Sequence, residues 1–137
     1  MTQTAMRTFF LNKLSRDKLV DIMENRGSYI NWRYLSNEEF NEQLRIKLAE
    51  ETQEVIVAQS RDELIAELAD VFEVIDSLAK LHNIPQEEIV TAQTTKRNEK
   101  GGFEGRKFFE TARHPAGSFG EKYCLADPIK YPEIISE

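Results

Sequence analysis

The stretch of sequence at residues 50–70, EETQEVIVAQSRDELIAELAD, contains two pairs of acidic residues at helical spacing. Glu51 is paired with Glu54, and Glu67 is paired with Asp70, three positions apart in each case. Residues three apart on a helix point to the same side, so each pair is expected to present two carboxylates together. The stretch therefore predicts two helices, each carrying one carboxylate pair.

Both pairs fall at positions where core residues are expected. On a helical wheel, Glu51 lies in an apolar stripe with Leu44 and Val55, and Glu67 shares a stripe with Val71. Burial of an ionised carboxylate costs several kcal/mol unless the group is ion-paired or holds a metal. The two pairs therefore need a compensating positive charge.

The basic residues on these faces are too few to neutralise four acids, because Lys47 is the only cation near the Glu51 stripe. A bound hard cation is the simplest compensation, and we expect Mg²⁺, with Mn²⁺ as the alternative. A single ExxE or ExxD is usually a solvated helix face. Two such pairs inside apolar stripes favour metal binding instead. The predicted ligands are Glu51, Glu54, Glu67 and Asp70.

Length, charge and cysteine content restrict the class of protein. A chain of 137 residues fits one domain, with a core at about residues 13–109 and an irregular C-terminal extension at 110–137. The net charge of −6 argues against binding to duplex nucleic acid. No stretch is apolar enough to span a membrane. Cys124 is the single cysteine, which excludes an internal disulfide and fits a cytoplasmic protein.

One sequence signature that marks the start of a helix occurs twice and defines the two central helices. Ser36 with Glu39, and Ser60 with Glu63, match the S-x-x-E capping box that begins a helix. The helix that follows Ser36 is expected to end near residue 59, so a tight turn at Ser60 makes the two helices antiparallel neighbours. The sequence thus predicts an all-α fold, an antiparallel bundle of about four helices followed by an irregular C-terminal segment.

Shorter helices are expected on either side of this hairpin. The helix before the hairpin should begin near Ser15, which is expected to cap it, and end at Gly27. Residues 1–12, before this helix, are expected to be a poorly ordered or extended lead-in. The helix after the hairpin, the fourth in the chain, should begin after Pro85 and end before Gly101.

The turn at Ser60 also places the acids relative to one another. Glu51 and Glu54 precede Ser60 by nine and six residues, and Glu67 and Asp70 follow it by seven and ten. Antiparallel helices would bring these residues to matching heights. All four carboxylates are therefore expected to converge on one point.

The acidic pattern resembles a known family. EETQE at residues 50–54 and ELAD at 67–70 are similar to the EExxE…ExxD signature of the MazG-like all-α nucleoside triphosphate pyrophosphatases. KLSRDK at 13–18 resembles the KLVRDKIP opening of its phosphoribosyl-ATP pyrophosphohydrolase-like branch, and KRNEKGGF at 96–103 resembles that branch's KxxxRGGF element. The likeness covers most of residues 13–109. Lys100 stands where the branch has Arg, which keeps the charge but loses the planar fork.

The resemblance implies hydrolysis of a nucleotide substrate between its α and β phosphates, giving a monophosphate and pyrophosphate, with clearance of damaged nucleotides as one role. The carboxylates named above would hold the metal. Glu50 and Glu54 are the expected catalytic acids, with Glu50 holding a second ion or the attacking water. The cations expected to bind phosphates are Lys96, Lys100, Arg97, Lys13, Arg16 and Lys18.

Other functions use similar helices. A non-catalytic metal- or nucleotide-binding regulator is the main alternative. A di-iron bundle would need Glu-x-x-His pairs, and neither His82 nor His114 follows a glutamate by three residues. A purely structural dimerisation module is the last alternative. A second apolar patch on the helix after Ser36 predicts self-association into a homodimer or homotetramer, and its residues are Ile46, Ala49, Ile56 and Val57.

Overall fold

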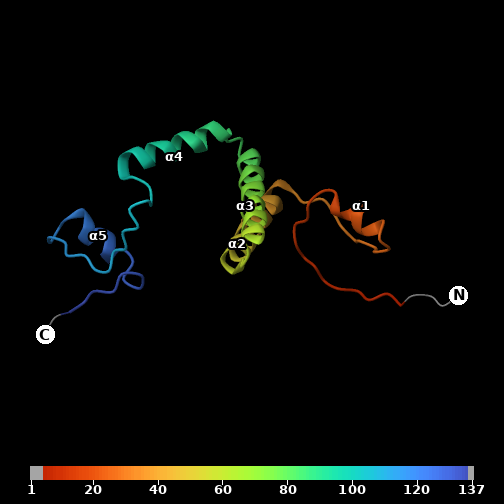
Figure 1. Cartoon of the computed structure of the whole chain (residues 1–137), viewed down its shortest axis with the longest axis horizontal. Coiled ribbons are helices and arrows are strands. Elements are labelled where there is room, and N and C mark those ends of the chain that lie inside the picture. Colours follow the sequence, from red (N-terminus) through yellow and green to blue (C-terminus); the bar gives the residue numbers. More distant parts are fainter. Residues whose placement is uncertain (1–4, 136–137) are drawn as a thin grey trace. The chain divides into compact units, whose positions relative to one another are not determined.

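The computed structural model describes residues 5–135, which contain five helices and no strand (Figure 1). The helices are α1 (Leu19–Glu24), α2 (Asn37–Val57), α3 (Arg61–Leu81), α4 (Gln86–Lys100) and α5 (Phe119–Leu125). The predicted all-α fold is confirmed. Residues 1–4 of the predicted lead-in lie outside the described residues, and residues 5–12 have no regular secondary structure.

The two predicted capping signatures begin α2 and α3. The Ser36 hydroxyl accepts the Glu39 N–H at 3.2 Å, and the Glu39 carboxylate accepts the Ser36 N–H at 3.2 Å. Ser60 accepts the Glu63 N–H at 3.1 Å, while the Glu63 carboxylate accepts from the Gln59 N–H at 3.0 Å. These bonds satisfy amide groups that have no partner inside the helix. They fix the turn between α2 and α3 close to its predicted position.

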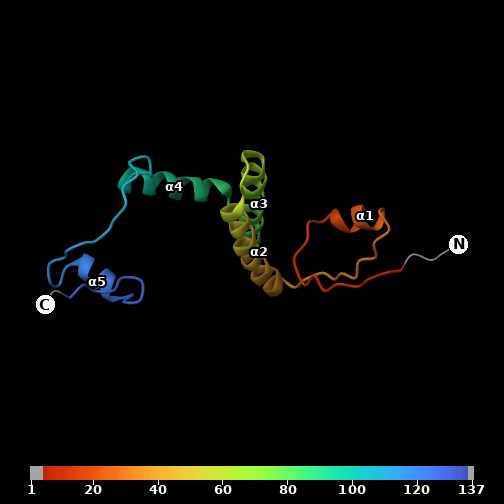
Figure 2. The ribbon, with the colours of Figure 1, turned by 60° about the horizontal axis from the view of Figure 1, so that its bottom comes forward.

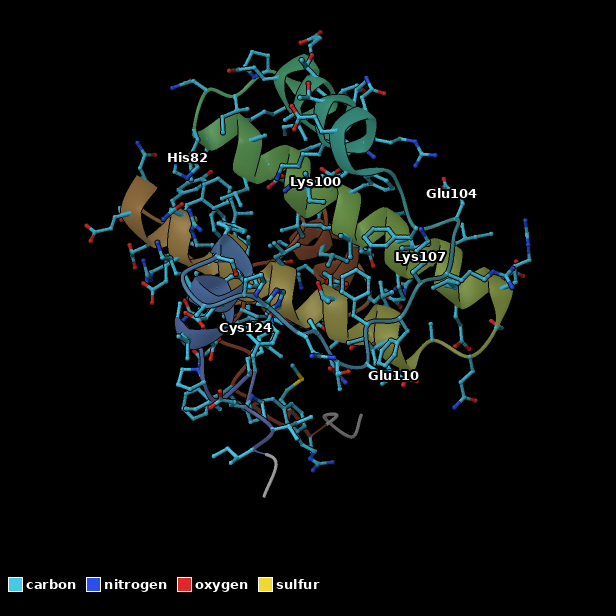
Figure 3. All side chains as sticks on the ribbon, turned by 90° about the vertical axis from the view of Figure 1, so that its left-hand side faces the viewer. His82, Lys100, Glu104, Lys107, Glu110 and Cys124 are labelled. Carbon is cyan, nitrogen blue, oxygen red and sulfur yellow. The ribbon has the colours of Figure 1, made fainter. Side chains whose placement is uncertain are left out.

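Helices α2 and α3 form the hairpin that carries the site, and Figures 1 and 2 both show them side by side. They are the only helices among residues 5–135 that pack extensively on each other. Leu44 of α2 and Val74 of α3 are the buried apolar residues of this interface. His82, which Figure 3 labels, follows the end of α3. Its Nε2 lies 2.7 Å from Asn41 Oδ1 of α2 and joins the two helices there.

The N-terminus of α2 is reinforced by an ion pair that has a measurable pH dependence. Arg33 donates two hydrogen bonds to the Glu39 carboxylate, at 2.6 and 3.2 Å. The hydrogen bond from Arg33, followed by that from the Ser36 N–H, lowers the pKa of Glu39 from 4.5 to about 2. Because the pKa is lower in the folded protein, this stabilisation is present above pH 4.5 and is lost as the pH falls towards about 2.

We therefore expect Glu39→Gln to be less stable than the wild type above pH 4.5, and the difference to shrink as the pH falls towards about 2. Thermal melts of both proteins across this pH range measure the difference directly. Glu42→Gln, at an exposed position of the same helix, is the matched control. A stability difference between wild type and Glu39→Gln that is independent of pH would contradict the assigned cause.

Helix α1 begins later than the sequence predicts. Ser15 does not cap it, because its hydroxyl donates to the Arg16 carbonyl at 3.2 Å, and the N-cap residue is Lys18. The side chain of Arg16, two residues before this N-cap, is bound to Asp70 of α3. The helix ends at Glu24, three residues before the predicted stop at Gly27, and Gly27 lies in the turn that follows with a φ of +95°, which favours glycine.

Contacts divide the chain into two compact units, Met1–Asn98 and Glu99–Glu137. The second unit contains α5 within the segment predicted to be irregular. Ser118 accepts the Glu121 N–H at 3.3 Å, and the Glu121 carboxylate accepts the Gly117 N–H at 3.0 Å. Residues 118–121 thus form a third S-x-x-E capping signature, which was not predicted. Within the described part of the chain, every helix is too short or too polar to cross a bilayer.

Candidate functional site

Three carboxylates from the two central helices meet at one point. Glu51 of α2 and the pair Glu67 and Asp70 of α3 each place one oxygen within 4.8 Å of the others. Glu51 is only 8% exposed and is the one buried charged residue in the described range. Its predicted place in the apolar stripe is confirmed. We call these three residues the carboxylate cluster.

The fourth predicted ligand, Glu54, is exposed on α2 and lies outside this set of three. Its charge nevertheless acts on the cluster. Partial burial raises the pKa of Glu67, and the negative charges of Asp70 and Glu54 raise it further. Glu51 and Glu63 add smaller effects of the same sign. The negative charges around Glu67 therefore disfavour its ionised form.

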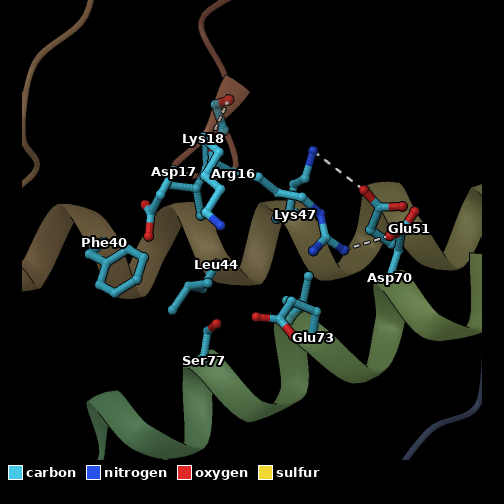
Figure 4. A pocket seen from close by; sticks show the side chains of 13 residues that line it. Arg16, Asp17, Lys18, Phe40, Leu44, Lys47, Glu51, Asp70, Glu73 and Ser77 are labelled. Carbon is cyan, nitrogen blue, oxygen red and sulfur yellow. Dashed lines mark hydrogen bonds and ion pairs between the residues drawn. The ribbon is translucent and has the colours of Figure 1, made fainter. Parts of the chain in front are cut away.

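Two cations are paired with the cluster (Figure 4). Lys47 Nζ lies 3.3 Å from Glu51 and 3.5 Å from Glu50, as its position in the sequence predicts. Arg16 Nη2 lies 2.6 Å from Asp70 Oδ1. Arg16 was predicted to bind phosphate, and no local signal indicates Asp70 as its partner, because the two residues are 54 positions apart.

The donor set fits a hard divalent cation. All three groups are carboxylates, the oxygen ligands that Mg²⁺, Mn²⁺ and Ca²⁺ prefer. Three oxygens on one octahedral Mg²⁺ form at least two neighbouring pairs at about 3 Å, so carboxylates whose oxygens lie within 4.8 Å of one another would have to move closer to hold the ion. A cation bound here would be held by Glu51, Glu67 and Asp70, and it would relieve the repulsion that raises the pKa of Glu67.

The other predicted residues are placed differently. Glu50 is half-buried beside Lys47 and outside the carboxylate cluster. Lys96 and Arg97 lie on α4, and Lys96 forms no ion pair in the described structure. Lys100 ends α4 and belongs to the second unit. The clamp that these cations are predicted to form stays a prediction.

A pocket of about 450 Å³ adjoins the cluster and lies between residues 14–18 and the α2–α3 hairpin (Figure 4). Glu51 and Asp70 line it, together with Arg16, Lys18 and Lys47, whereas Lys13 does not. The other polar residues that line the pocket are Ser15, which was predicted only as a helix cap, and Asp17, Glu73 and Ser77, which were not predicted. Glu73 and Ser77 follow Asp70 by three and seven residues, and this helical spacing was the signal that places them on the same face.

A family model described as phosphoribosyl-ATP pyrophosphohydrolase matches residues 17–98, more than half of the chain. No significant match was found among curated proteins or among solved structures. The matched range includes all of α1, α2 and α3 and most of α4. It therefore contains every member of the carboxylate cluster, and it leaves out Arg16 and Lys100.

Proposed function

Because the chain belongs to the phosphoribosyl-ATP pyrophosphohydrolase family, we propose that it is a Mg²⁺-dependent enzyme that cleaves nucleoside triphosphates between the α and β phosphates. The products are a nucleoside monophosphate and pyrophosphate. The family implies a nucleotide pyrophosphohydrolase, and it includes enzymes that use a divalent metal. The identity of the ion, the triphosphate substrate and a role in clearing damaged nucleotides are the parts that we add.

The observation that carries this proposal is the burial of Glu51 beside Glu67 and Asp70. Phosphoryl transfer needs little covalent chemistry from the protein and much neutralisation of charge. A divalent cation held by these carboxylates would supply that neutralisation at the phosphates. Without such an ion, three clustered acids next to a phosphate chain would repel the substrate.

The chain's own acids also have to position the attacking water. Glu50 and Glu54 flank Glu51 on α2, and neither is part of the carboxylate cluster. A carboxylate outside the metal ligands is able to accept a proton from water. We assign this role to Glu50 or Glu54, and we assign the substrate phosphates to Lys96 and Lys100.

The proposal is tested by incubating the full chain with a panel of nucleoside triphosphates and Mg²⁺ and measuring pyrophosphate and monophosphate. We expect the two products in equal amounts and no activity after chelation of the metal. Release of inorganic phosphate and a nucleoside diphosphate would overturn the site of cleavage. Binding of nucleotide without any turnover would favour the non-catalytic regulator.

We also propose that the enzyme is a homodimer or homotetramer. Only Leu44 and Val74 are buried apolar residues in the described structure, which is a small core for two helices of 21 residues each. The predicted patch on α2 is open, with Ile56 exposed by 70% and Val57 by 54%. Apolar surface of this kind is stabilised when another chain covers it.

Sedimentation at micromolar concentration should therefore show a dimer or a larger closed assembly. Replacing Ile56 by Lys puts a charge into the patch and should shift the equilibrium towards the monomer. Gln93→Lys, at an exposed position of α4 outside the patch, is the matched control. A wild-type protein that sediments as a monomer would contradict this assignment.

A further inference from the structure

Lys47 is a lysine at a position where a core residue is expected. It lies on α2, three residues after the buried Leu44 and four before Glu51, so it shares their face of the helix. Its side chain is only 19% exposed, and its Nζ lies 3.3 Å from Glu51 Oε1 (Figure 4). The side chains of the pair between Arg16 and Asp70 are more open, at 58% and 37%. Because burial of an ammonium group is costly, Lys47 needs a specific electrostatic role.

One such role is to neutralise Glu51 while the cluster holds no ion. Glu51 is 8% exposed, and a buried carboxylate without a counter-charge is strongly destabilising. Helix stability alone does not account for the pair, because a lysine four residues before a glutamate is the less favourable order on a helix. Lys47 is therefore the counter-charge of Glu51 in the metal-free protein.

The charge balance around Lys47 changes when the cluster holds a divalent ion. The three carboxylates carry three negative charges, which the two charges of the ion and the one of Arg16 would balance. Lys47 is then a surplus cation. Its second partner, Glu50, is 40% exposed and lies 3.5 Å away, at the limit of a hydrogen bond, so this contact holds it weakly.

Lys47 also lines the pocket beside the cluster. Its stem of four carbons is flexible and its ammonium has three donors, so it is able to turn towards the pocket while α2 stays in place. Three cations and four carboxylates line this pocket, which gives the lining an excess of negative charge before an ion is bound. An anion is therefore attracted only after the ion has removed this excess and Lys47 has become available.

We infer that Lys47 exchanges Glu51 for the phosphate chain of the substrate once the metal site is filled. This inference rests on the proposed function and adds a phosphate-binding residue to it. Lys47 is not among the cations predicted to bind phosphate, which lie at residues 13–18 and on α4. Unlike those residues, it is carried by the same helix as Glu51, one turn away.

The experiment measures two affinities of Lys47→Met and of the wild type by calorimetry at pH 8, with the full chain. Met keeps the apolar stem and removes the charge. Mg²⁺ alone should bind the variant roughly three- to tenfold more tightly, because a like charge beside a ligand has been removed. Inorganic pyrophosphate in excess Mg²⁺ should bind about tenfold more weakly, because a hydrogen bond from a charged donor has been lost. Arg45→Met, at an exposed position of α2 outside the pocket, is the matched control and should change neither affinity.

The opposite shifts of the two affinities distinguish this role from a purely structural one. A lysine that only stabilises the metal-free protein would give tighter Mg²⁺ binding with unchanged pyrophosphate binding, and this result would overturn the inference. Weaker binding of both would overturn it as well, because Lys47 would then only keep the site in shape. Neither titration needs turnover, so both decide the inference even if no triphosphate is cleaved and the proposed function fails.

A measurement on the wild type covers the case in which Lys47→Met does not fold. Acetic anhydride labels accessible lysines, and mass spectrometry reports the labelling of each one. In Mg²⁺, addition of pyrophosphate should lower the labelling of Lys47. The exposed Lys80 of α3 is the internal control and should be labelled equally with and without pyrophosphate. Equal labelling of Lys47 in both conditions would refute its contact with phosphate.

Discussion

Replacement of Glu51 by Gln is expected to lower kcat/KM by about a hundred- to thousandfold. Glu51 is the most buried member of the carboxylate cluster, and Gln keeps its size while removing its charge. Charge stabilisation by a bound metal contributes several kcal/mol to such reactions, and each 1.4 kcal/mol corresponds to about a tenfold change in rate. A steady-state assay of pyrophosphate release measures the loss.

Metal binding by the same variant separates this cause from a folding defect. Mg²⁺ should raise the Tm of the wild type, because a ligand that binds only the folded state stabilises it. The Glu51→Gln protein should lose this response. Glu42→Gln, an exposed acid on the same helix, should keep both the activity and the response. An unchanged Mg²⁺ response in Glu51→Gln would refute the assignment of Glu51 as a ligand.

The cations of α4 give the next largest expected effect. Replacement of Lys96 or Lys100 by Met keeps the apolar stem and removes only the charge, so the fold should survive. A hydrogen bond from a charged group to phosphate contributes about 1.5–3 kcal/mol, which corresponds to a roughly ten- to hundredfold loss of kcat/KM for each residue. The loss should be the same for every active nucleotide, because phosphates are common to all of them.

Lys80→Met, at an exposed position in the last turn of α3, is the control for this experiment. It removes a charge from the same unit as Lys96 and should leave turnover unchanged. Full activity in both Lys96→Met and Lys100→Met would mean that these cations only complement the C-terminal dipole of α4. A defect that depends on the base would instead assign them to the nucleoside.

The features that were predictable from the sequence depend on local interactions. The capping of α2 by Ser36 and Glu39 joins residues three positions apart, so four letters of sequence identify it. The burial of Glu51 follows from helical periodicity, because residues three or four positions apart lie on the same face of a helix. Lys47 beside Glu51 follows in the same way, from a separation of four residues.

The features that were not predictable depend on contacts between distant residues. Ser15 has the right chemistry for a helix cap, but its hydroxyl donates to the Arg16 carbonyl, and the Arg16 side chain pairs with Asp70, 54 positions away. The pocket depends on the same contact, because residues 14–18 form one of its walls. Helix α5 is a different case, because the capping pattern at Ser118 is local and could have predicted it. The surrounding prolines and glycines favoured an irregular segment instead.

The ion pair between Arg16 and Asp70 links two equilibria. If a metal ion takes Oδ1 of Asp70, Arg16 loses that acceptor, so the ion competes with the attachment of residues 14–18 to α3. Such coupling is reciprocal, and each process weakens the other by the same factor. A phosphate group that draws Arg16 away from Asp70 would then tighten the metal by that factor. The protein should hold its metal ion most firmly while a nucleotide is bound.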